Sequence, residues 1–344
     1  MKTAVKMGVL TLALASGPVM AKQAVCVYDL LGTTGDIYNM AKDWALPAKG
    51  WGADVELVGY TDERVATQDF ITGKCDALMA TGFRTRQFNP VAASIDSLGA
   101  SSVVKDNKVD INASYEVVHR TIQVFSSSAA GKLMKRGDYE VAGIIPFGTA
   151  FPIVNDRNIK TVEGLAGKKI AAFDYDKAQA VMIQKIGAQP VSADITNFAA
   201  KFNNGSVDMI AAPALAYKPL ELYRGIGTKG AINRFPILIL TYQMIVRDSK
   251  FPAGFAEKSR TYWLGQFGRA RDLIKKAEAE IPAGTWSDLT PENMLKYTVM
   301  LRESREDIAN QGIYNKTGLR IMKKIRCGVN PASAECATNS ETWQ

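Results

Sequence analysis

Short apolar segments alternate with amphipathic ones along most of this chain, and that alternation limits the fold more than any other feature. In the first part, the apolar, strand-like segments are 24–30, 54–60 and 76–82. Helix-like segments separate them: one at 36–49, and one that Asp62 begins as an N-cap and Gly73 ends. Strands that alternate with helices predict a largely parallel sheet with helices on its faces.

A second unit of the same kind follows later in the sequence. Its strand-like segments are 169–173, 189–192 and 207–212, and its helix-like segments are 176–186 and 196–203. Two long extended stretches, 141–154 and 237–246, are expected to cross between the units, and from about residue 253 the chain is helical in pattern. The predicted domains are 22–140 with 236–262 as lobe I, 141–235 as lobe II, and 263–344 as a helical region packed on both.

The first 21 residues have the three-part pattern of a secretory signal peptide. Lys2 and Lys6 supply a cationic start, residues 7–15 are apolar, and residues 19–21 (VMA) form a cleavage-type ending. The apolar run is far shorter than the roughly 18 residues that a membrane span needs, and no later stretch is apolar enough to span one. A buried N-terminal helix is the alternative. We expect the mature chain to be exported to the periplasm.

Four cysteines remain after the predicted signal peptide, which suits an oxidising compartment. Four cysteines allow three pairings. We favour Cys26 with Cys75, at the beginnings of two neighbouring strands, and Cys327 with Cys336, across a short C-terminal loop. Buried free thiols are the alternative for the first pair. No metal or other cofactor is expected, because no C-x-x-C occurs and His119 is the only histidine.

The chain is mildly basic, with a formal net charge of +8 at pH 7. Its densest basic run, residues 320–326 (RIMKKIR), interleaves apolar residues at helical spacing. This pattern predicts a solvated helix face rather than a nucleic-acid or lipid site. We therefore expect no nucleic-acid partner.

Three motifs in the second unit carry a family resemblance. Residues 161–170 read TVEGLAGKKI, residues 186–191 read IGAQPV, and residues 203–208 read NNGSVD, followed by Pro213. In this order they resemble D-L-K-G-K-K-I-R-V, L-G-A-x-P-V and L-Q-T-G-V-V-D-G-x-x-x-P of the TRAP-transporter (DctP-like) periplasmic solute-binding proteins. The resemblance implies a two-lobed, type II periplasmic-binding-protein (Venus-flytrap) fold. It also implies a receptor that captures a small molecule between its lobes for a membrane transporter component.

The chain departs from that family at two positions. Ala171 stands where the family has an arginine that holds the ligand carboxylate, and Ala212 stands where it often has an asparagine. An organic-acid ligand therefore does not carry over. Proteins similar to this chain also bear a name that links them to RND efflux and aminoglycoside resistance. Without a spanning segment in its mature part, this chain is expected to be at most a soluble partner of such a pump.

In a two-lobed receptor the ligand lies at the carboxyl ends of parallel strands, beside helix N-termini. Helix N–H groups after Thr33 and Thr34 favour an anionic ligand group. Aromatic residues at these points can stack on a ring or a cation, although core packing is the alternative for each. The candidate ligand-binding residues are Asp29, Thr33, Thr34, Arg84, Arg86, Phe147, Phe173, Asp174, Tyr175, Tyr217, Tyr242 and Gln243.

Arg84 is the preferred anchor among these candidates. It follows the strand-ending Gly82 and can replace the missing family arginine, because a guanidinium pairs with a planar anion through two hydrogen bonds. The alternative for Arg84 and Arg86 is an exposed helix start. Asp174, if it faces the cleft, favours a cationic or hydroxyl-rich ligand, so the sign of the ligand charge stays open.

No group of residues typical of an enzyme active site accompanies these candidates. His119 lies in a helix-like segment without a nucleophile motif nearby, which favours a structural role. Residues 225–230 (GIGTKG) have the spacing of a dinucleotide motif, but they follow a helix and lead into a strand, the reverse of the order required. We expect a binding protein. The alternatives are an enzyme using His119 or Asp174, an envelope accessory protein associated with drug efflux, and a non-transport ligand sensor.

Overall fold

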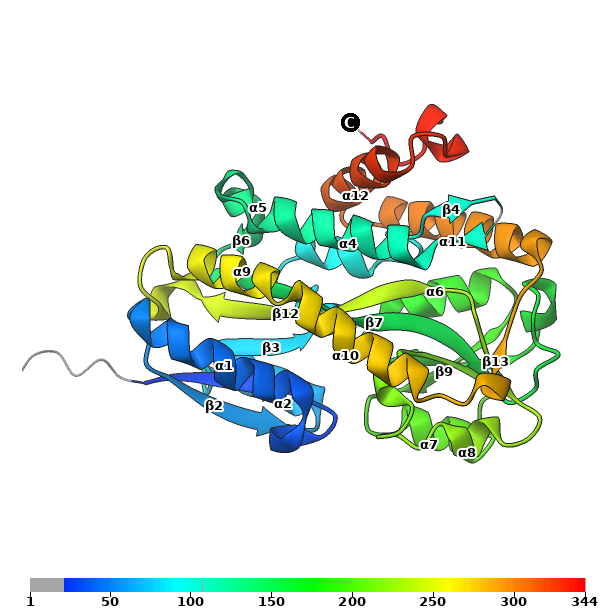
Figure 1. Ribbon diagram of the computed structural model, residues 1–344, viewed down its shortest axis with the longest axis horizontal. Coiled ribbons are helices and arrows are strands. Elements are labelled where there is room, and N and C mark those ends of the chain that lie inside the picture. Colours follow the sequence, from blue (N-terminus) through cyan, green and yellow to red (C-terminus); the bar gives the residue numbers. More distant parts are fainter. Residues whose placement is uncertain (1–21, 107, 344) are drawn as a thin grey trace, which may run out of the picture.

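The computed structural model describes residues 22–106 and 108–343, so the predicted signal peptide lies outside the described residues. An 11-stranded sheet forms its centre (Figure 1). The main strands are β1 (Gln23–Tyr28), β2 (Val55–Tyr60), β3 (Ala77–Thr81), β7 (Tyr139–Val154), β8 (Lys169–Phe173), β9 (Gln189–Ala193), β10 (Met209–Ala212) and β12 (Leu238–Arg247). Their order across the sheet is β2-β1-β3-β12-β7-β10-β8-β9. Short strands β6 (Lys135–Arg136) and β11 (Ala231–Asn233) pair with β7, and β13 (Trp286–Ser287) pairs with β11. Strand β4 (Val104–Lys105) pairs with β5 (Lys108–Val109) separately.

Two parallel groups of strands flank a central antiparallel pair. β1 is parallel to β2 and β3, and β8 is parallel to β9 and β10. Between the groups, β12 is antiparallel to β3 and β7, and β10 is antiparallel to β7. Both predicted βαβαβ units and the two-lobed α/β fold are thus confirmed. The helices of these units are α1 (Asp36–Gly50), α2 (Glu63–Ile71), α6 (Lys177–Lys185) and α7 (Phe198–Asn203). The proposed residue boundaries of the lobes remain a prediction.

The long strands β7 and β12 are the two crossing segments expected from the sequence. All of β7 after its first two residues is buried, as is all of β12 before Arg247. Helices α9 (Phe255–Gly265) and α10 (Phe267–Ala279) lie across this pair (Figure 1). Gly143 in β7 permits the close approach, because a Cβ there would lie 2.1 Å from Cδ1 of Trp263 in α9. Helices on the faces explain the continuous apolar runs of these strands.

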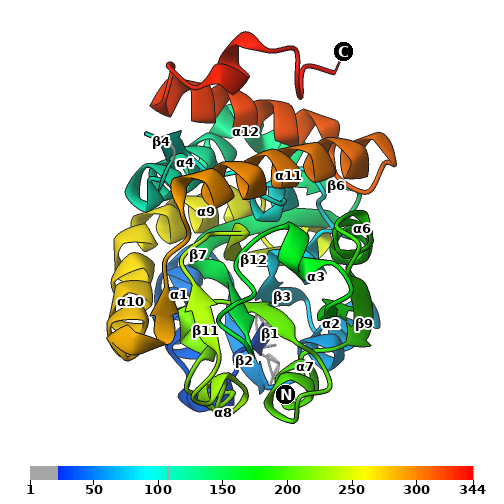
Figure 2. The same ribbon diagram turned by 90° about the vertical axis from the view of Figure 1, so that its right-hand side faces the viewer.

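The C-terminal region is helical, as predicted. Helices α11 (Pro291–Asn310) and α12 (Lys316–Val329) lie with α4 (Ile111–Ser126) at the end of the molecule away from α1 and α2 (Figures 1 and 2). Thr290 caps α11 by accepting a hydrogen bond from the backbone N–H of Asn293. The remaining short helices are α3 (Gly82–Thr85), α5 (Gly131–Met134) and α8 (Tyr223–Ile226). Within the described residues, no helix has the length and apolarity that a membrane crossing requires.

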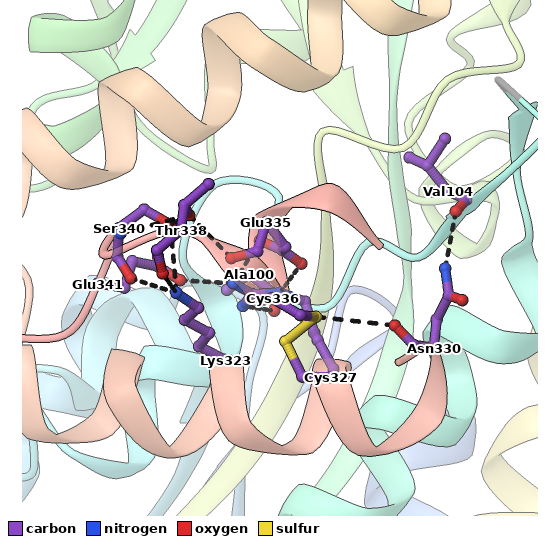
Figure 3. The surroundings of a disulfide bond; sticks show 11 residues. Ala100, Val104, Lys323, Cys327, Asn330, Glu335, Cys336, Thr338, Ser340 and Glu341 are labelled. Carbon is purple, nitrogen blue, oxygen red and sulfur yellow. Dashed lines mark hydrogen bonds and ion pairs between the residues drawn. A yellow bond between two sulfur atoms is a disulfide. The ribbon is translucent and has the colours of Figure 1, made fainter. Parts of the chain in front are cut away.

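The basic run at 320–326 lies on α12, but the prediction of a solvated face is wrong for two of its residues. Lys323 and Arg326 are buried, and Figure 3 shows Lys323 beneath the C-terminal segment. The Lys323 ammonium donates to the carbonyl oxygens of Thr338 (2.8 Å) and Ser340 (2.5 Å). Spacing along α12 does not reveal this arrangement, because the acceptors come from a segment without periodic pattern.

Glu341 joins α11 and α12 through two arginines. Its carboxylate pairs with Arg305 of α11 and, at 2.5 Å, with Arg326 of α12. Burial alone would raise the pKa of Glu341, but the two guanidinium groups lower that pKa to about 2. The carboxylate is therefore ionised at all physiological pH values and clamps the two helices together.

Asp96, at the end of a 3-10 turn (Ala92–Asp96), ties that turn to the central strand pair. The register of β12 against β7 shifts after Leu240, and there the Thr241 backbone N–H donates to Asp96 Oδ1 at 2.5 Å. The Thr241 hydroxyl and the Gln243 amide donate to Oδ2 at 2.7 and 3.2 Å. Burial raises the pKa of Asp96 to about 7, although the hydrogen bonds from Thr241 oppose the increase.

Both predicted disulfides are present. Cys26 in β1 is bonded to Cys75, just before β3, with a Cα–Cα distance of 5.8 Å. Cys327 at the end of α12 is bonded to Cys336 with a Cα–Cα distance of 5.6 Å. The first bond closes a long loop within the N-terminal unit, and the second fixes the C-terminal segment to α12.

Removing the Cys26–Cys75 bond should destabilise the protein more than removing the Cys327–Cys336 bond. The sequence separations are 49 and 9 residues, and chain entropy makes the losses about 4 and about 2.6 kcal/mol respectively. Urea unfolding of Cys26→Ala/Cys75→Ala and Cys327→Ala/Cys336→Ala measures both. A larger loss for the C-terminal pair would contradict the entropic ranking.

The buried Asp96 should make stability depend on pH. Its pKa is about 7 in the folded protein, whereas an exposed aspartate has a pKa of 3.8. Its contribution is thus fully present below about pH 4 and is lost as the pH rises through 7. Asp96→Asn cannot titrate, so the unfolding free energy of the wild type minus that of the variant should fall between pH 4 and pH 7. Denaturation at both pH values tests this, and a constant difference would refute it.

Candidate functional site

A cavity of about 80 Å³ lies between the two halves of the sheet. It is bounded by the ends of β1 and β3 on one side and by β8, β10 and the residues after them on the other. This is the position at which carboxyl ends of parallel strands are expected to bind a ligand. Most of the wall is apolar, and its aromatic members are Tyr28, Phe83, Phe147, Phe173, Tyr175 and Phe198.

The aromatic wall is continuous from one side to the other. Phe173 stacks on Tyr175, with ring centroids 5.3 Å apart and planes inclined by 8°, and meets Phe198 edge-on at 5.3 Å. From the opposite side of the cavity, the ring centroid of Phe83 lies 6.3 Å from that of Phe173. Such a wall offers flat apolar surface to a ligand but few hydrogen bonds.

The polar part of the site is a cluster around Glu63, the first residue of α2. Glu63 is 1% exposed, lines the cavity, and accepts hydrogen bonds from the Thr81 backbone N–H (2.6 Å) and the Tyr175 hydroxyl (3.4 Å). Nε of Arg84 lies 3.9 Å from Oε2 of Glu63. Burial raises the pKa of the Glu63 carboxyl, while Thr81 and Arg84 oppose the increase.

Arg84 is buried, so the alternative of an exposed helix start is wrong for it. The residue is 9% exposed, and its guanidinium carbon lies 3.3 Å from the centre of the Tyr175 ring, a cation–π contact between the two halves of the sheet. Among residues 22–106 and 108–343, nothing accepts a hydrogen bond from its Nε or Nη2. Arg84 is not itself among the residues that line the cavity, but it contacts Glu63 and Tyr175, which are. Its Nε and Nη2 carry three buried N–H groups that an acceptor reaching them would satisfy.

Arg86 forms an ion pair that also joins the two halves. Nη1 of Arg86 lies 3.0 Å from Oδ1 of Asp176, and the side chains are 13% and 2% exposed. Asp176 also caps α6, because it accepts from the backbone N–H of Ala178. The guanidinium of Arg86 lies 5.0 Å from the Tyr314 ring. Because the pair is buried, loss of either partner would leave the other charge uncompensated, which is costlier than breaking a surface pair.

The helix N-terminus expected to bind an anion is already occupied by Asp29. Its carboxylate accepts the backbone N–H groups of Leu31 (2.8 Å), Ile37 (2.9 Å) and Tyr38 (3.1 Å). Gly35 leaves room for it, since a Cβ there would lie 1.9 Å from Oδ1. Thr33 and Thr34, expected beside the ligand, are exposed.

The remaining predicted residues divide between the cavity and its surroundings. Phe147, Phe173 and Tyr175 line the cavity, as do Ala171 and Ala212, the two positions that differ from the TRAP family. Tyr242 is buried between Tyr28 and Phe147, with ring centroids 5.9 and 4.7 Å from its own. Gln243 accepts a hydrogen bond from the Thr85 hydroxyl behind the cavity wall. Tyr217 packs near Tyr223 outside the lining, and Asp174 is exposed.

Sequence reasoning missed Glu63 and Gln179. Glu63 follows the N-cap Asp62, whose capping role is confirmed by bonds to the N–H groups of Arg64 and Val65. An acidic residue in the first turn is ordinarily a solvated partner of the helix dipole, so nothing local marks it as buried. Gln179 lines the cavity and accepts from the Phe173 N–H at 3.0 Å.

Other candidates lie elsewhere. His119 is on α4, outside the cavity lining, with its ring 4.4 Å from that of Phe267. Residues 225–230 run from the end of α8 into β11, the order expected for a sequence that does not bind a dinucleotide. In the described part of the chain, no group of three His, Cys, Asp or Glu side chains is placed to hold a metal ion.

Solved structures with the same fold are TRAP periplasmic solute-binding proteins. One from Ralstonia eutropha, with bound (S)-2-acetolactate, is 12% identical, covers 90% of this chain and 99% of its own, and has a TM-score of 0.69. The ectoine-binding protein of the TeaABC TRAP transporter of Halomonas elongata is 11% identical, covers 90% of this chain and all of its own, and also has a TM-score of 0.69. At such identities the likeness establishes the fold alone.

Closer relatives come from Acinetobacter baumannii. The protein named "Probable solute-binding protein AdeT1" is 44% identical over 315 residues, which is 92% of this chain and all of the relative. "Probable solute-binding protein AdeT2" is 26% identical over 62% of this chain and 90% of its own length. The profile of the family described as "Solute-binding protein AdeT 1/2" matches residues 45–341. The chain therefore belongs to the AdeT 1/2 family of solute-binding proteins.

Proposed function

We propose that this protein is a periplasmic receptor that captures a small solute in the cavity between its lobes and presents it to a membrane transporter component. Membership of a solute-binding family indicates a non-enzymatic binding protein. The observation that carries the proposal is Arg84, a buried arginine that contacts the cavity-lining Glu63 and Tyr175 and has two nitrogens from which no described residue accepts a hydrogen bond. Retaining such groups costs stability unless a ligand uses them.

The proposed site has a polar end and an apolar end. Arg84, Glu63 and the Tyr175 hydroxyl form the polar end, where they fix the orientation of a ligand head group. Phe147 and Phe173 belong to the apolar end, where burial of the ligand body supplies most of the affinity. Ala171 adds a small apolar contact where the TRAP family has its arginine, so the anchoring charge comes from the opposite lobe.

Contacts between the two halves of the sheet stabilise the closed form of the receptor. The Arg86–Asp176 ion pair and the Arg84–Tyr175 stack both break when the lobes separate. A solute that touches both halves adds to these contacts and shifts the population toward the closed form. The closed surface is then available to a membrane partner, as the resemblance to TRAP receptors implies.

A solute that binds in the cavity should raise the melting temperature, and Arg84→Ala should reduce that effect. The full chain, expressed with its own leader and purified from the periplasm, is screened against acids, amino acids, amides, sugars, polyamines and aminoglycosides. Ligands that bind only the folded state stabilise it by mass action. Loss of a hydrogen bond to a charged group costs about 1.5–3 kcal/mol, so we expect Kd to rise at least about tenfold in the variant.

The matched control for this screen is Arg120→Ala, which removes an exposed pair with Glu116 on α4 (2.7 Å) far from the cavity lining. Its solute affinities should equal those of the wild type. Absence of any stabilising solute would contradict the receptor function and favour an accessory role in the envelope.

Breaking the ion pair between the halves should open the protein. Arg86→Ala leaves the Asp176 carboxylate buried without its cation, which should lower the free energy of unfolding by about 3 kcal/mol. The solute-free variant should also have a larger radius of gyration than the wild type in small-angle X-ray scattering. Arg120→Ala serves again as the control with unchanged scattering. An unchanged radius for Arg86→Ala would show that the pair does not hold the lobes closed.

A further inference from the structure

The charges at the cavity cancel one another. Glu63 is the only charged residue among those that line it in the described part of the chain. The cation beside it is Arg84, whose Nε lies 3.9 Å from the Glu63 carboxylate. With the Glu63 carboxylate ionised, as its contacts with the Thr81 N–H and with Arg84 favour, one buried negative charge and one buried positive charge leave the site without net charge.

The pair is also incompletely bonded. At 3.9 Å the arginine and the carboxylate are too far apart for a hydrogen bond. Arg84 therefore retains two nitrogens, Nε and Nη2, without an acceptor in the described structure. From the same described residues, Glu63 accepts two hydrogen bonds, those of Thr81 and Tyr175, whereas a carboxylate has about four acceptor positions. The site presents donors and acceptors side by side.

The surroundings penalise a ligand with net charge. The wall is largely aromatic and aliphatic, and an unpaired charge in such an environment loses its hydration without full compensation. An anion that pairs with Arg84 leaves the Glu63 carboxylate unpaired, and a cation that pairs with Glu63 does the same to Arg84. A ligand that supplies an acceptor to one residue and a donor to the other satisfies both.

We propose that this site selects a solute without net charge, whose head group carries a hydrogen-bond donor beside an acceptor and whose body is apolar and flat. Uncharged amides and zwitterions meet the first condition, and the stacked rings of Phe173 and Tyr175 favour the second. This inference rests on the proposed function, because it specifies the solute of the same cavity. It distinguishes this chain from a carboxylate-binding receptor, in which a lone arginine faces the ligand.

The test uses three molecules of nearly the same shape that differ in charge: benzoate (negative), benzamide (neutral) and benzamidinium (positive). Isothermal titration of each into the full-length, exported protein at pH 7.5 gives three values of Kd. We expect benzamide to bind at least tenfold more tightly than either ion. A second series repeats the comparison with a zwitterion and an aliphatic body. It compares L-valine with 3-methylbutanoate, which lacks the ammonium group, and with isobutylamine, which lacks the carboxylate.

Two variants should switch the preference in opposite directions. Glu63→Gln leaves the site positive, so benzoate should become the tightest ligand. Arg84→Gln leaves it negative, so benzamidinium should become the tightest. Arg64→Gln is the matched control, since Arg64 is on the same helix as Glu63 but exposed, with its partner Asp62 at 3.3 Å; its preference should equal that of the wild type. The comparison within the wild type does not depend on whether the variants fold.

Tighter binding of benzoate or benzamidinium than of benzamide to the wild type would overturn the inference and leave the receptor function intact. If none of these molecules binds, the solutes found in the thermal screen decide: neutral ones support the inference, and charged ones overturn it. If neither experiment finds a binding solute, both the inference and the proposed function are wrong.

Discussion

The antiparallel pairing of β7 with β12 is the interaction on which the rest of the molecule depends. Each parallel group is attached to the pair through one strand only, β3 to β12 and β10 to β7. The register of the pair shifts at two points, where its hydrogen bonding is irregular. At the first of these points, Asp96 accepts a hydrogen bond from the Thr241 N–H. The ladder is therefore buried and regular along most of its length and irregular at two points.

Carboxylates and guanidinium groups of the chain itself occupy most positions at which an ionic ligand would be expected. Asp29 fills the N-terminus of α1, and Asp176 takes the charge of Arg86. The exception is the Glu63–Arg84 pair, which remains too far apart to bond directly. Arg86 also retains a buried nitrogen, Nη2, without an acceptor among the described residues. Of these two pairs, however, only Glu63–Arg84 includes a residue that lines the cavity.

Sequence alone predicted the parts of the structure that local pattern determines: the two βαβαβ units, the crossing strands, both disulfides and the capping role of Asp62. It indicated that Arg84 would lie near the carboxyl ends of the strands, because these ends are a fixed point of such folds; the structure has Arg84 buried against Glu63 and Tyr175, which line the cavity. It did not find Glu63, since a first-turn acidic residue has the same local pattern whether it faces water or a cavity. It misjudged Lys323 and Arg326 for a related reason, because their partners are contributed by an irregular segment that follows α12.

The ion pairs of Glu341 make the last described residues part of the packed structure. Arg326 has a second carboxylate partner, Glu335, whereas the other acceptor that the described structure gives Arg305 is the carbonyl oxygen of Leu98. Without Glu341, Arg305 would be buried without a counter-charge, which is unfavourable. Loss of the residues from Glu341 onward would therefore destabilise the packing around α11, although it removes no helix or strand.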